Sequence, residues 1–458
     1  MHNTPDIVIV GGGIAGLSAA FELHKRGIPF RLLERADRFG GVILTEQIDG
    51  FTIDAGPDSL LVQKPAAIAL CRELGLGDRL MFTKTPRQAF VRRAGMLHPL
   101  PEGSVLGIPT RWRAFLTSRL FSITGKIRMA AEVAIPPRRT TEDESVASFI
   151  RRRFGKEAVE YLAEPLLAGI HAGDVDRLSM RALFPRFVEA ERQHGSVIRA
   201  FRRTRMPAST EGAFVSLPGG IGELASALVL ALPADALRVN ASVKSIEGPS
   251  PFVVTLASGE SFSAPAVILG TPAFVTADLV RPVDTALSDL CAAVPYASSA
   301  AVALAYPRSA VAHPLRGSGF LVPRVERMPI TAATWVSSKW PRRAPDDHVL
   351  LRAYLGGARD PRAIESSDAE LTEQAHRILG EVLGISGKPR LARVYRWTKA
   401  NAQHEVGHLD RVAAIDRRLR ESPGLYLTGS GFRGVGIADC IADARATAAT
   451  AAQQLTRR

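Results

Sequence analysis

The sequence predicts an α/β protein (α+β overall) that begins with a Rossmann-like dinucleotide-binding unit. The apolar run 7–10 (Ile-Val-Ile-Val) has the pattern of a strand buried on both faces of a parallel sheet. Residues Gly11–Gly16 follow at once with the pattern G-x-G-x-x-G and lead into apolar residues at helical spacing. A second apolar strand, 30–33, ends in the acidic residue Glu34. Together these observations indicate a strand–helix–strand unit that ends in a carboxylate.

Each part of this unit has a physical role in binding a dinucleotide. The first glycine permits a tight turn, the second lets a pyrophosphate approach the helix N-terminus, and the third lets helix and strand pack closely. Glu34 then stands where a carboxylate can accept hydrogen bonds from a ribose diol. The alternative is a glycine-rich turn that binds nothing, but the complete strand–helix–strand context favours a nucleotide.

The composition limits the number of domains, the compartment and the membrane topology that we expect. The chain has 458 residues and 46% hydrophobic residues, which predicts a large core and more than one domain. Its three cysteines (Cys71, Cys291 and Cys440) are too widely spaced for a disulfide framework or a metal site, so we expect a reducing compartment and no metal. The first predicted strand begins so early that we expect no signal or transit peptide, and no apolar run is long enough to span a membrane.

The net charge of +13 comes mostly from arginine and points to an anionic partner. Nucleic acid is disfavoured, because the arginines are dispersed and accompany no nucleic-acid motif. An anionic small molecule and an anionic membrane surface both remain compatible with this charge.

The segment after Glu34 favours a flavin over a nicotinamide. A nicotinamide domain would continue with another strand–helix unit, but here Arg38-Phe-Gly-Gly41 is followed by a hairpin-like segment and the glycine-rich stretch 50–59. A flavin nucleotide that lies extended along the chain explains this departure. Arg38 is a candidate to offset the diphosphate charge.

The C-terminal region repeats the strand, glycine turn and helix order. Residues 424–428 predict a strand, and 434–437 predict the start of a helix whose dipole would stabilise a reduced, anionic flavin ring. We therefore expect the first and last segments of the chain to meet across one cofactor.

The rest of the chain predicts three discontinuous domains. These are an FAD-binding domain (1–85, 213–297 and 395–458), a sheet-based substrate domain (86–106 and 298–394) and a helical domain (107–212). Apolar strands at 300–305 and 349–355 and a helix at 368–383 support the substrate domain. Residues 164–180 are expected to form a small-residue loop between helices, and His171 in it is interpreted as a structural histidine rather than a base.

The helical domain raises the question of membrane contact. The segment that starts at Arg111 mixes bulky apolar residues with cations. An ordinary helix with a solvated cationic face and an interfacial helix on anionic lipid both account for this pattern. We predict peripheral contact through residues 107–135 as a hypothesis for testing.

Several stretches, in order along nearly the whole chain, are similar to one family. They are Gly50-Phe to Ser59, Gly169-Ile-His-Ala-Gly-Asp to Ser179, Phe184-Pro to His194-Gly-Ser196, Arg396-Trp to His404-Glu-Val-Gly-His408, and Arg433-Gly-Val-Gly-Ile-Ala-Asp-Cys-Ile441. With Gly11–Gly16 and Thr271-Pro272, they resemble the flavin amine oxidase superfamily, and within it the protoporphyrinogen/coproporphyrinogen oxidase family of haem biosynthesis.

The resemblance implies non-covalent FAD, because the turn 428–432 lacks the cysteine that covalent relatives use. The positions that match the family's FAD contacts are Gly11, Gly12, Gly13, Ile14, Ala15, Gly16, Glu34, Arg35, Arg38, Gly41, Val42, Gly56, Pro57, Asp58, Ser59, Val243, Trp397, Ser430, Val435, Gly436 and Ile437.

Five further positions match the family's substrate contacts. Arg87 is the candidate to bind a propionate, since a guanidinium pairs with a carboxylate in a fork. Leu321 and Trp340 match apolar positions on either side of the macrocycle, and Gly169 and Gly173 match the loop at its edge. Ordinary core and surface roles are the alternatives. Two departures from the family, at Leu44 and at 317–319, concern the details of the pocket.

The expected activity is oxidation of protoporphyrinogen IX to protoporphyrin IX, with three molecules of dioxygen reduced to hydrogen peroxide. Oxidation of coproporphyrinogen III to coproporphyrin III is the alternative, and a flavin amine oxidase or carotenoid desaturase is a more distant one. A non-enzymatic flavoprotein or porphyrin carrier is a third class. We identify no general base. The resemblance also implies a monomer or homodimer, a cytoplasmic or peripheral membrane location, and transfer of product to a ferrochelatase.

Overall fold

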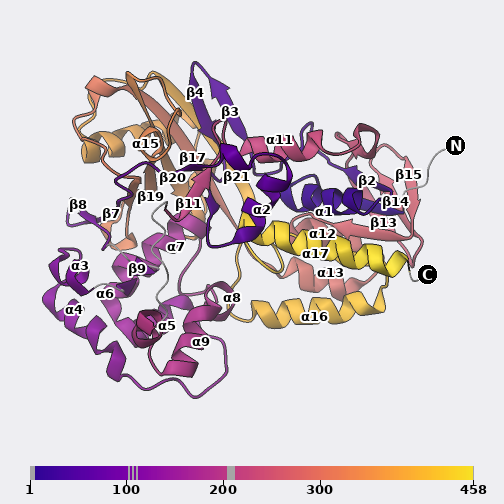
Figure 1. The fold of residues 1–458 in the computed structure, drawn as a ribbon, viewed down its shortest axis with the longest axis horizontal. Coiled ribbons are helices and arrows are strands. Elements are labelled where there is room, and N and C mark those ends of the chain that lie inside the picture. The colour runs from indigo at the N-terminus through magenta and orange to yellow at the C-terminus, as the bar shows by residue number, and fades with distance from the viewer. Residues whose placement is uncertain (1–5, 102–103, 106–107, 110–111, 204–211, 457–458) are drawn as a thin grey trace.

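A five-stranded parallel sheet forms the centre of the nucleotide-binding domain in the computed structural model, which describes residues 6–101, 104–105, 108–109, 112–203 and 212–456. Of the predicted membrane segment 107–135, residues 107, 110 and 111 lie outside the described residues. The strand order is β12-β2-β1-β16-β22 (Figure 1). The strands are β1 (Ile7–Val10), β2 (Phe30–Leu33), β12 (Leu237–Arg238), β16 (Ala266–Leu269) and β22 (Leu425–Leu427).

Both faces of this sheet are covered, which explains why β1 and β16 are apolar and buried at every position. Ile7 and Ile9 of β1 contact one hydrophobic cluster, and Val8 and Val10 contact another. The first cluster lies under α1 (Ile14–Lys25), α2 (Pro65–Glu73), α11 (Gly222–Leu230) and α17 (Ile437–Leu455). The second lies under α12 (Ala273–Val280), α13 (Thr285–Ala292), α16 (His408–Glu421) and the antiparallel strands β13 (Val243–Glu247), β14 (Phe252–Leu256) and β15 (Ser261–Ala264).

The first and last helices of the chain pack against each other. Figure 1 shows α1 and α17 side by side on one face of the sheet. Their contact uses small residues, including Ala19 of α1 and Ala444 and Ala448 of α17, all fully buried. Small side chains permit close approach of the two helices, so the two termini of the chain lie in one domain, as the sequence predicts.

A seven-stranded sheet forms the second domain, in the order β21-β17-β20-β19-β18-β7-β8. Its strands are β7 (Ala89–Arg93), β8 (Met96–Pro99), β17 (Tyr296–Pro307), β18 (Gly319–Leu321), β19 (Ile330–Trp335), β20 (His348–Gly356) and β21 (Leu391–Ala402). One face packs on α15 (Asp368–Leu383), whose bounds agree with the predicted helix. The predicted domain boundary at 395 falls within β21.

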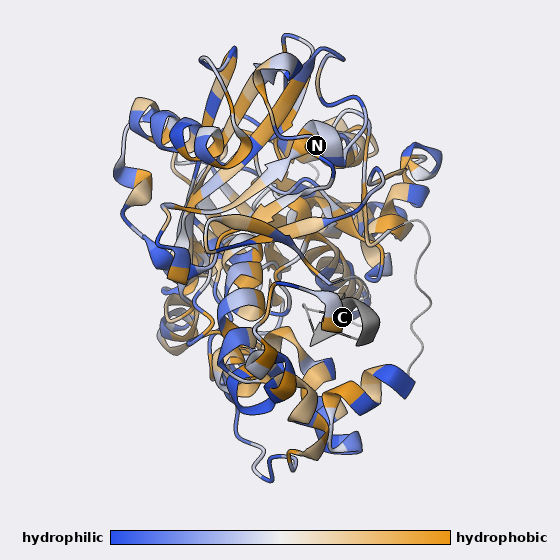
Figure 2. Ribbon diagram, turned by 90° about the vertical axis from the view of Figure 1, so that its left-hand side faces the viewer, coloured by the Kyte–Doolittle hydropathy of each residue, from blue (hydrophilic) through white to orange (hydrophobic). Residues whose placement is uncertain are grey.

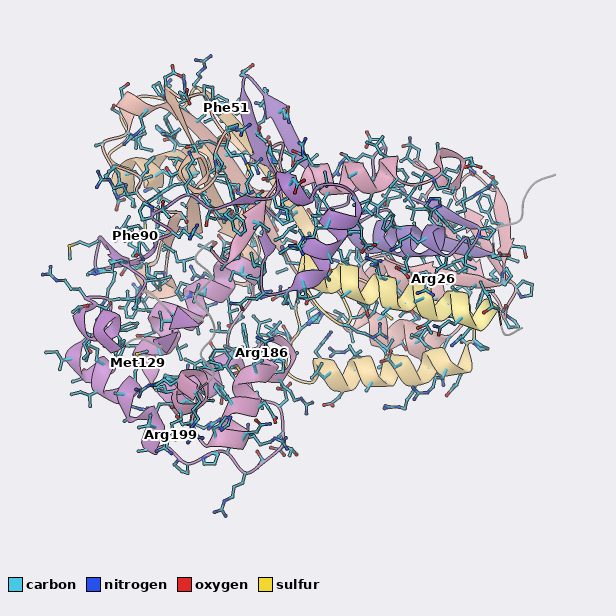
Figure 3. All side chains as sticks on the ribbon, in the orientation of Figure 1. Arg26, Phe51, Phe90, Met129, Arg186 and Arg199 are labelled. Atoms are coloured by element: carbon cyan, nitrogen blue, oxygen red, sulfur yellow. The ribbon has the colours of Figure 1, made fainter. Side chains whose placement is uncertain are left out.

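The opposite face of the seven-stranded sheet receives the hairpin β3 (Thr45–Ile48) and β4 (Phe51–Asp54). Phe51, labelled in Figure 3, is fully buried there with Ile53 against Ala303 and Trp340. Figure 2 shows long hydrophobic stretches in the strands of this sheet, in agreement with burial on both faces. The hairpin thus joins the cofactor-binding segment to the substrate domain. A small sheet of β5 (Leu60–Leu61), β11 (Phe214–Ser216) and β6 (Met81–Phe82) lies beside it.

The helical layer packs around its own hydrophobic cluster, in which Met129 (labelled in Figure 3) and Phe149 are buried. Its members are α3 (Trp112–Thr117), α4 (Ile123–Ala130), α5 (Val146–Phe154), α6 (Lys156–Ala158), α7 (Glu164–His171), α8 (Met180–Leu183), α9 (Pro185–His194) and α10 (Val197–Arg203), with the short strands β9 (Ser104–Val105) and β10 (Ile108–Pro109) nearby. Two fully buried charges, Arg153 and Glu132, form an ion pair at its centre.

The expected loop at 164–180 is partly wrong. Residues Glu164–His171 form the helix α7, with Pro165 in its first turn, where a missing N–H costs nothing. The helix ends at Ala172, which has the left-handed backbone conformation (φ 52°). The small residues after this point form the loop, so the prediction holds only for 172–179.

Candidate flavin site

The glycine loop has the close contacts that only glycine permits. Gly11 has φ +101°, and a Cβ at Gly16 would stand 1.8 Å from the carbonyl oxygen of Gly11. A Cβ at Gly12 would stand 2.4 Å from the ring of Phe39. The loop leads directly into α1, whose first N–H groups have no acceptor within the helix. These N–H groups and the helix dipole form a cradle that fits a diphosphate.

Glu34 lies beside this loop, as the sequence predicts. Its Oε2 accepts a hydrogen bond from the Gly12 N–H at 2.6 Å, and its Oε1 accepts one from the Ala36 N–H at 2.8 Å. A carboxylate offers further lone pairs, so Glu34 can accept hydrogen bonds from a ribose as well. Arg35, next in the chain, has an exposed side chain.

Arg38, the candidate to offset the diphosphate charge, bonds to the backbone of its own turn. Its guanidinium donates to the carbonyl oxygens of Gly41 at 2.7 Å and of Phe39 and Ile43 at 3.3 Å each. These hydrogen bonds therefore fix the shape of the turn 38–43. This turn abuts the glycine loop, because a Cβ at Gly41 would stand 3.2 Å from the Cα of Gly13.

Three predicted cofactor residues from distant parts of the chain meet beside this turn. A Cβ at Gly56 would stand 2.1 Å from the carbonyl oxygen of Val42 and 3.6 Å from the ring of Trp397. The Trp397 Nε1–H donates to the carbonyl oxygen of Ala55 at 2.9 Å. The Val42 side chain is 42% exposed, which leaves an apolar surface at the position where the family places the cofactor.

Asp58 faces the protein interior. Its carboxylate accepts two hydrogen bonds from Lys339 Nζ, at 2.9 and 3.0 Å, and lies 3.4 Å from Arg352 Nη2 and from Trp340 Nε1. Burial opposes ionisation, but Lys339 and Arg352 outweigh it and hold the pKa of Asp58 well below its ordinary value. Asp58 therefore stabilises the cofactor loop from its buried side, through Lys339 and Arg352. Ser59 donates to it at 2.8 Å, and Pro57 precedes it half-buried.

Arg352 is a residue that the sequence analysis missed. It lies on β20, nearly fully buried, and donates to the carbonyl oxygens of Gly56, at 2.9 Å, and Asp54. Its guanidinium also stacks on the ring of Tyr354, 5.0 Å from the ring centroid. A single arginine within the apolar run 349–355 was the signal that could have identified it, since a buried cation needs a partner.

The C-terminal turn reaches the glycine loop. A Cβ at Gly429 would stand 3.7 Å from the Cβ of Ala15, so the first and last segments meet as predicted. Helix α17 begins at Ile437 with Gly436 as its N-cap, and Asp439 Oδ2 accepts from the Gly436 N–H at 3.2 Å. Lys64 Nζ lies 2.5 Å from Asp439.

Two remaining cofactor positions lie at the edges of these segments. Val435 is half-buried in the turn that leads to α17. Val243 begins β13 and packs, partly buried, against the second cluster of the nucleotide-binding domain.

The cysteines are all buried and unpaired. Cys440, in the first turn of α17, has its Sγ 3.6 Å from the carbonyl oxygen of Gly434, and burial raises its pKa to about 12. A buried thiol with this pKa is a poor nucleophile.

Two of the predicted substrate residues are neighbours. A Cβ at Gly169, in α7, would stand 3.2 Å from Leu321 Cδ2 in β18, so helical layer and substrate sheet meet at this point. Gly173 lies in the loop that follows α7, and a Cβ there would stand 2.5 Å from Gln403 Oε1. At both glycines a side chain would therefore clash with a residue from another part of the chain.

The other two substrate residues lie elsewhere. Arg87 is exposed just before β7, and its Nε donates to the carbonyl oxygen of Thr83 at 3.1 Å. Trp340 is fully buried in the cluster with Phe51, and its Nε1 lies 3.4 Å from Asp58. This surrounding gives Trp340 a core role in the structure, which is the alternative noted for it above.

His171 is half-buried at the end of α7, and its surroundings lower its pKa to about 4, chiefly through burial. Such a ring is a weak base, in agreement with the structural role expected for it. Within the described residues there is no group of three His, Cys, Asp or Glu side chains placed to bind a metal ion. No helix among them is both long enough and apolar enough to cross a membrane.

Comparisons with known proteins agree with this geometry. A family model described as flavin containing amine oxidoreductase matches residues 14–452. The coproporphyrinogen III oxidase of Bacillus subtilis (strain 168) is 36% identical over 97% of this chain and 97% of its own. The chloroplastic protoporphyrinogen oxidase of Nicotiana tabacum is 29% identical over 99% of this chain and 86% of its own. A crystal structure of a candidate protoporphyrinogen oxidase from Exiguobacterium sp. 255-15 has a TM-score of 0.87 and 32% identity, covering 99% of this chain and 100% of that one.

The chain belongs to the flavin-containing amine oxidoreductase family, in the group that holds the protoporphyrinogen and coproporphyrinogen oxidases. It is a flavoprotein oxidoreductase of porphyrin biosynthesis. The glycine cradle, Glu34 and the exposed Val42 fit a flavin dinucleotide, and the mixed α/β fold is confirmed.

Proposed function

We propose that this chain binds FAD without a covalent bond and oxidises coproporphyrinogen III to coproporphyrin III with dioxygen. This choice reverses the order of preference from the sequence analysis, where protoporphyrinogen IX came first. The observation that carries it is full-length similarity, at 36% and 34% identity, to two bacterial proteins named coproporphyrinogen III oxidase. The name protoporphyrinogen oxidase belongs to two plant chloroplast enzymes at 29% and 31% identity and to the candidate from Exiguobacterium at 32%, all below the two coproporphyrinogen III oxidases.

The proposed cofactor role follows from the residues described above. The N–H groups at the start of α1 bind the diphosphate, and Glu34 accepts from the ribose. Val42, Gly56 and Trp397 lie along the flavin, and the turn before α17 faces its ring. The buried thiol of Cys440 supports a non-covalent cofactor. When bound, the flavin accepts hydride equivalents from the macrocycle and passes electrons to dioxygen.

The remaining residues orient the substrate. In this proposal Arg87 binds a propionate of the substrate. The apolar surface where Gly169 meets Leu321 contacts the macrocycle. Coproporphyrinogen III carries four propionates and protoporphyrinogen IX two, so a chain with net charge +13 is well suited to the more anionic substrate. No protein base is assigned, since the ring nitrogens of a porphyrinogen can release their own protons.

The test compares the two porphyrinogens with the purified holoprotein. Initial rates of porphyrin fluorescence are measured under identical conditions for both substrates, together with hydrogen peroxide release. We expect faster turnover of coproporphyrinogen III and bleaching of the flavin by that substrate without air. Rates at the spontaneous background for both substrates would contradict the proposed activity. Faster turnover of protoporphyrinogen IX would contradict the substrate choice alone.

We also propose peripheral membrane contact through the helical layer. Three apolar side chains of α3 and α4 are strongly exposed: Leu116, Ile123 and Ile127, at 60%, 78% and 65%. Lys126 lies between the latter two in the sequence. An apolar patch with adjacent cations favours an anionic lipid surface. Co-sedimentation with vesicles that contain phosphatidylglycerol at low salt tests this, and a protein that stays in the supernatant contradicts it.

A further inference from the structure

Two stacked histidines lie directly behind the C-terminal turn of the flavin site. His404 and His408 have ring centroids 3.8 Å apart and an interplanar angle of 13°. They are nearly fully buried, at 3% and 0% exposure, and His408 is the first residue of α16. They belong to the stretch 396–408, which carries the family resemblance, but the function proposed above uses only Trp397 of that stretch.

Both rings form hydrogen bonds to backbone carbonyl groups of the turn 430–432. His404 Nε2 lies 2.9 Å from the carbonyl oxygen of Ser430, and His408 Nε2 lies 2.7 Å from that of Phe432. A carbonyl oxygen can only accept, so Nε2 carries the hydrogen in both rings. This geometry defines the tautomer of each histidine.

The same geometry favours neutral rings. Protonation would place a hydrogen on Nδ1, and the buried Nδ1 of His408 has no hydrogen-bond partner in the described part of the chain. Two stacked cations would also repel each other. Burial accordingly lowers the pKa of both histidines, that of His404 to about 3.

The opposite side of this segment is bound to the loop 172–179. The carbonyl oxygen of His404 accepts from the Ser179 N–H at 2.8 Å, and the Val406 N–H donates to the carbonyl oxygen of Arg177 at 2.9 Å. Gln403 Nε2 donates to the carbonyl oxygen of His171 at 2.9 Å. Residues 403–408 therefore connect the loop at the proposed macrocycle edge with the turn at the proposed flavin ring.

We infer that His404 and His408 are positioning residues for the flavin, acting through the Ser430 and Phe432 carbonyls and tying that turn to the loop 172–179. This inference rests on the proposed FAD site. Neither histidine touches substrate in this assignment. The hydrogen bonds set the path of residues 430–436, and this path sets where the N-terminus of α17 points. Loss of either Nε2 donor leaves a buried carbonyl unpaired and lets the turn shift.

The experiment uses two isosteric families of variants. The amide nitrogen of glutamine superimposes on Nε2 of a histidine, whereas that of asparagine superimposes on Nδ1. His404→Gln and His408→Gln therefore retain the donor, and His404→Asn and His408→Asn lose it at similar polarity. His376→Phe is the matched control, because His376 stacks on Tyr306 with a 2.9 Å hydrogen bond but lies in the substrate domain.

The readouts are the dissociation constant of FAD, the visible spectrum of the bound flavin, and its midpoint potential with and without coproporphyrin III. We expect the Asn variants to bind FAD about tenfold more weakly, since one unpaired buried carbonyl costs about 1.4 kcal/mol. They should also show shifted flavin bands and lose the effect of the porphyrin on the potential. The Gln variants and His376→Phe should stay close to wild type.

Three outcomes would overturn the inference. One is a set of Asn variants that match wild type in affinity, spectrum and potential. Another is an equal loss of FAD affinity in the Asn and Gln variants, and the third is an equal loss of FAD affinity in His376→Phe. Either result would show general destabilisation. A wild-type protein that binds no FAD would instead overturn the proposed function, so the two failures are distinguishable.

Discussion

The guanidinium of Arg352, on the interior strand β20 of the seven-stranded sheet, lies 3.4 Å from the carboxylate of Asp58 in the proposed cofactor loop. Both groups are nearly fully buried, and Lys339 completes the cluster. This pair connects the substrate sheet to the loop 54–59 through charge as well as through the backbone bonds of Arg352. The stability of the loop and the geometry of the flavin site are therefore coupled to the substrate domain.

Removal of the Asp58 charge should destabilise the whole protein. Asp58→Asn leaves Lys339 and Arg352 buried without their counter-ion, which costs about 3 kcal/mol or more. Urea denaturation monitored by circular dichroism measures this. The matched control is Glu189→Gln, which removes one partner of the exposed pair with Arg192 and should change the midpoint little. Equal effects of the two variants would contradict the structural role of Asp58.

A methyl group at Gly56 should remove the flavin. The Cβ of Gly56→Ala would stand 2.1 Å from the Val42 carbonyl, so the loop must shift where the cofactor is expected to lie. We expect FAD to be lost on gel filtration and activity to fall in proportion. Gly380→Ala, within α15, is the control, since a Cβ there would stand 3.8 Å from the carbonyl oxygen of Ile385. This variant should stabilise the protein by about 0.5–1 kcal/mol. Full flavin content in Gly56→Ala would disprove the assignment of this loop.

Because His404 and His408 are buried in the neutral form, we expect the protein to lose stability at acid pH. The pKa of His404 is about 3 in the folded state and 6.5 ordinarily, so the unfolded state binds more protons between these values. The contribution of neutral His404 to the free energy of unfolding is complete above pH 6.5 and is lost as the pH falls towards 3. His408 and His171 also lower the pKa of His404, and Arg411 lowers that of His408.

Fluorescence of released FAD, recorded from pH 7.5 down to pH 4, measures this loss. We expect release to begin below about pH 6.5 and to begin at the same pH in His376→Phe. The variant His404→Gln cannot titrate and should retain its flavin to lower pH. Identical release curves for wild type and His404→Gln would rule out this titration as the cause.

Loss of the Arg87 guanidinium should weaken substrate binding more than chemistry. For Arg87→Ala we expect kcat/KM for coproporphyrinogen III to fall about tenfold, mainly through KM, since a charge-assisted hydrogen bond contributes about 1.5–3 kcal/mol. Arg342→Ala removes another exposed arginine, distant in the sequence, and should leave the kinetics unchanged. A KM equal to that of wild type would show that Arg87 is a surface residue.

The flavin should be released completely on denaturation. The three buried cysteines and the raised pKa of Cys440 leave no reactive thiol at the turn for a flavin bond. Acid precipitation should therefore move all the yellow colour to the supernatant, in wild type and in Cys440→Ser alike. Colour that remains in the pellet of wild type only would identify a covalent link.

Local patterns accounted for much of the fold. The strand 7–10, the glycine loop and the helix 368–383 were predictable because burial and backbone conformation impose a periodicity on neighbouring residues. The loop expected at 164–171 is a helix instead, because packing against β18 and β19 stabilises a segment whose glycine disfavours helix. The strand β21, in which the predicted boundary at 395 falls, was also not predicted, since its pairing with β17 is a non-local interaction.

The sequence by itself determined the dinucleotide-binding unit, the choice of a flavin and the meeting of both chain ends, since these depend on residue types with narrow backbone or chemical requirements. The tertiary structure alone decided which charges are paired. It directed Arg38 to its own turn, placed Asp58 against Arg352, and stacked His404 on His408 behind Ser430. Such pairs join residues distant in the chain or set the direction of a side chain, and no local spacing encodes either.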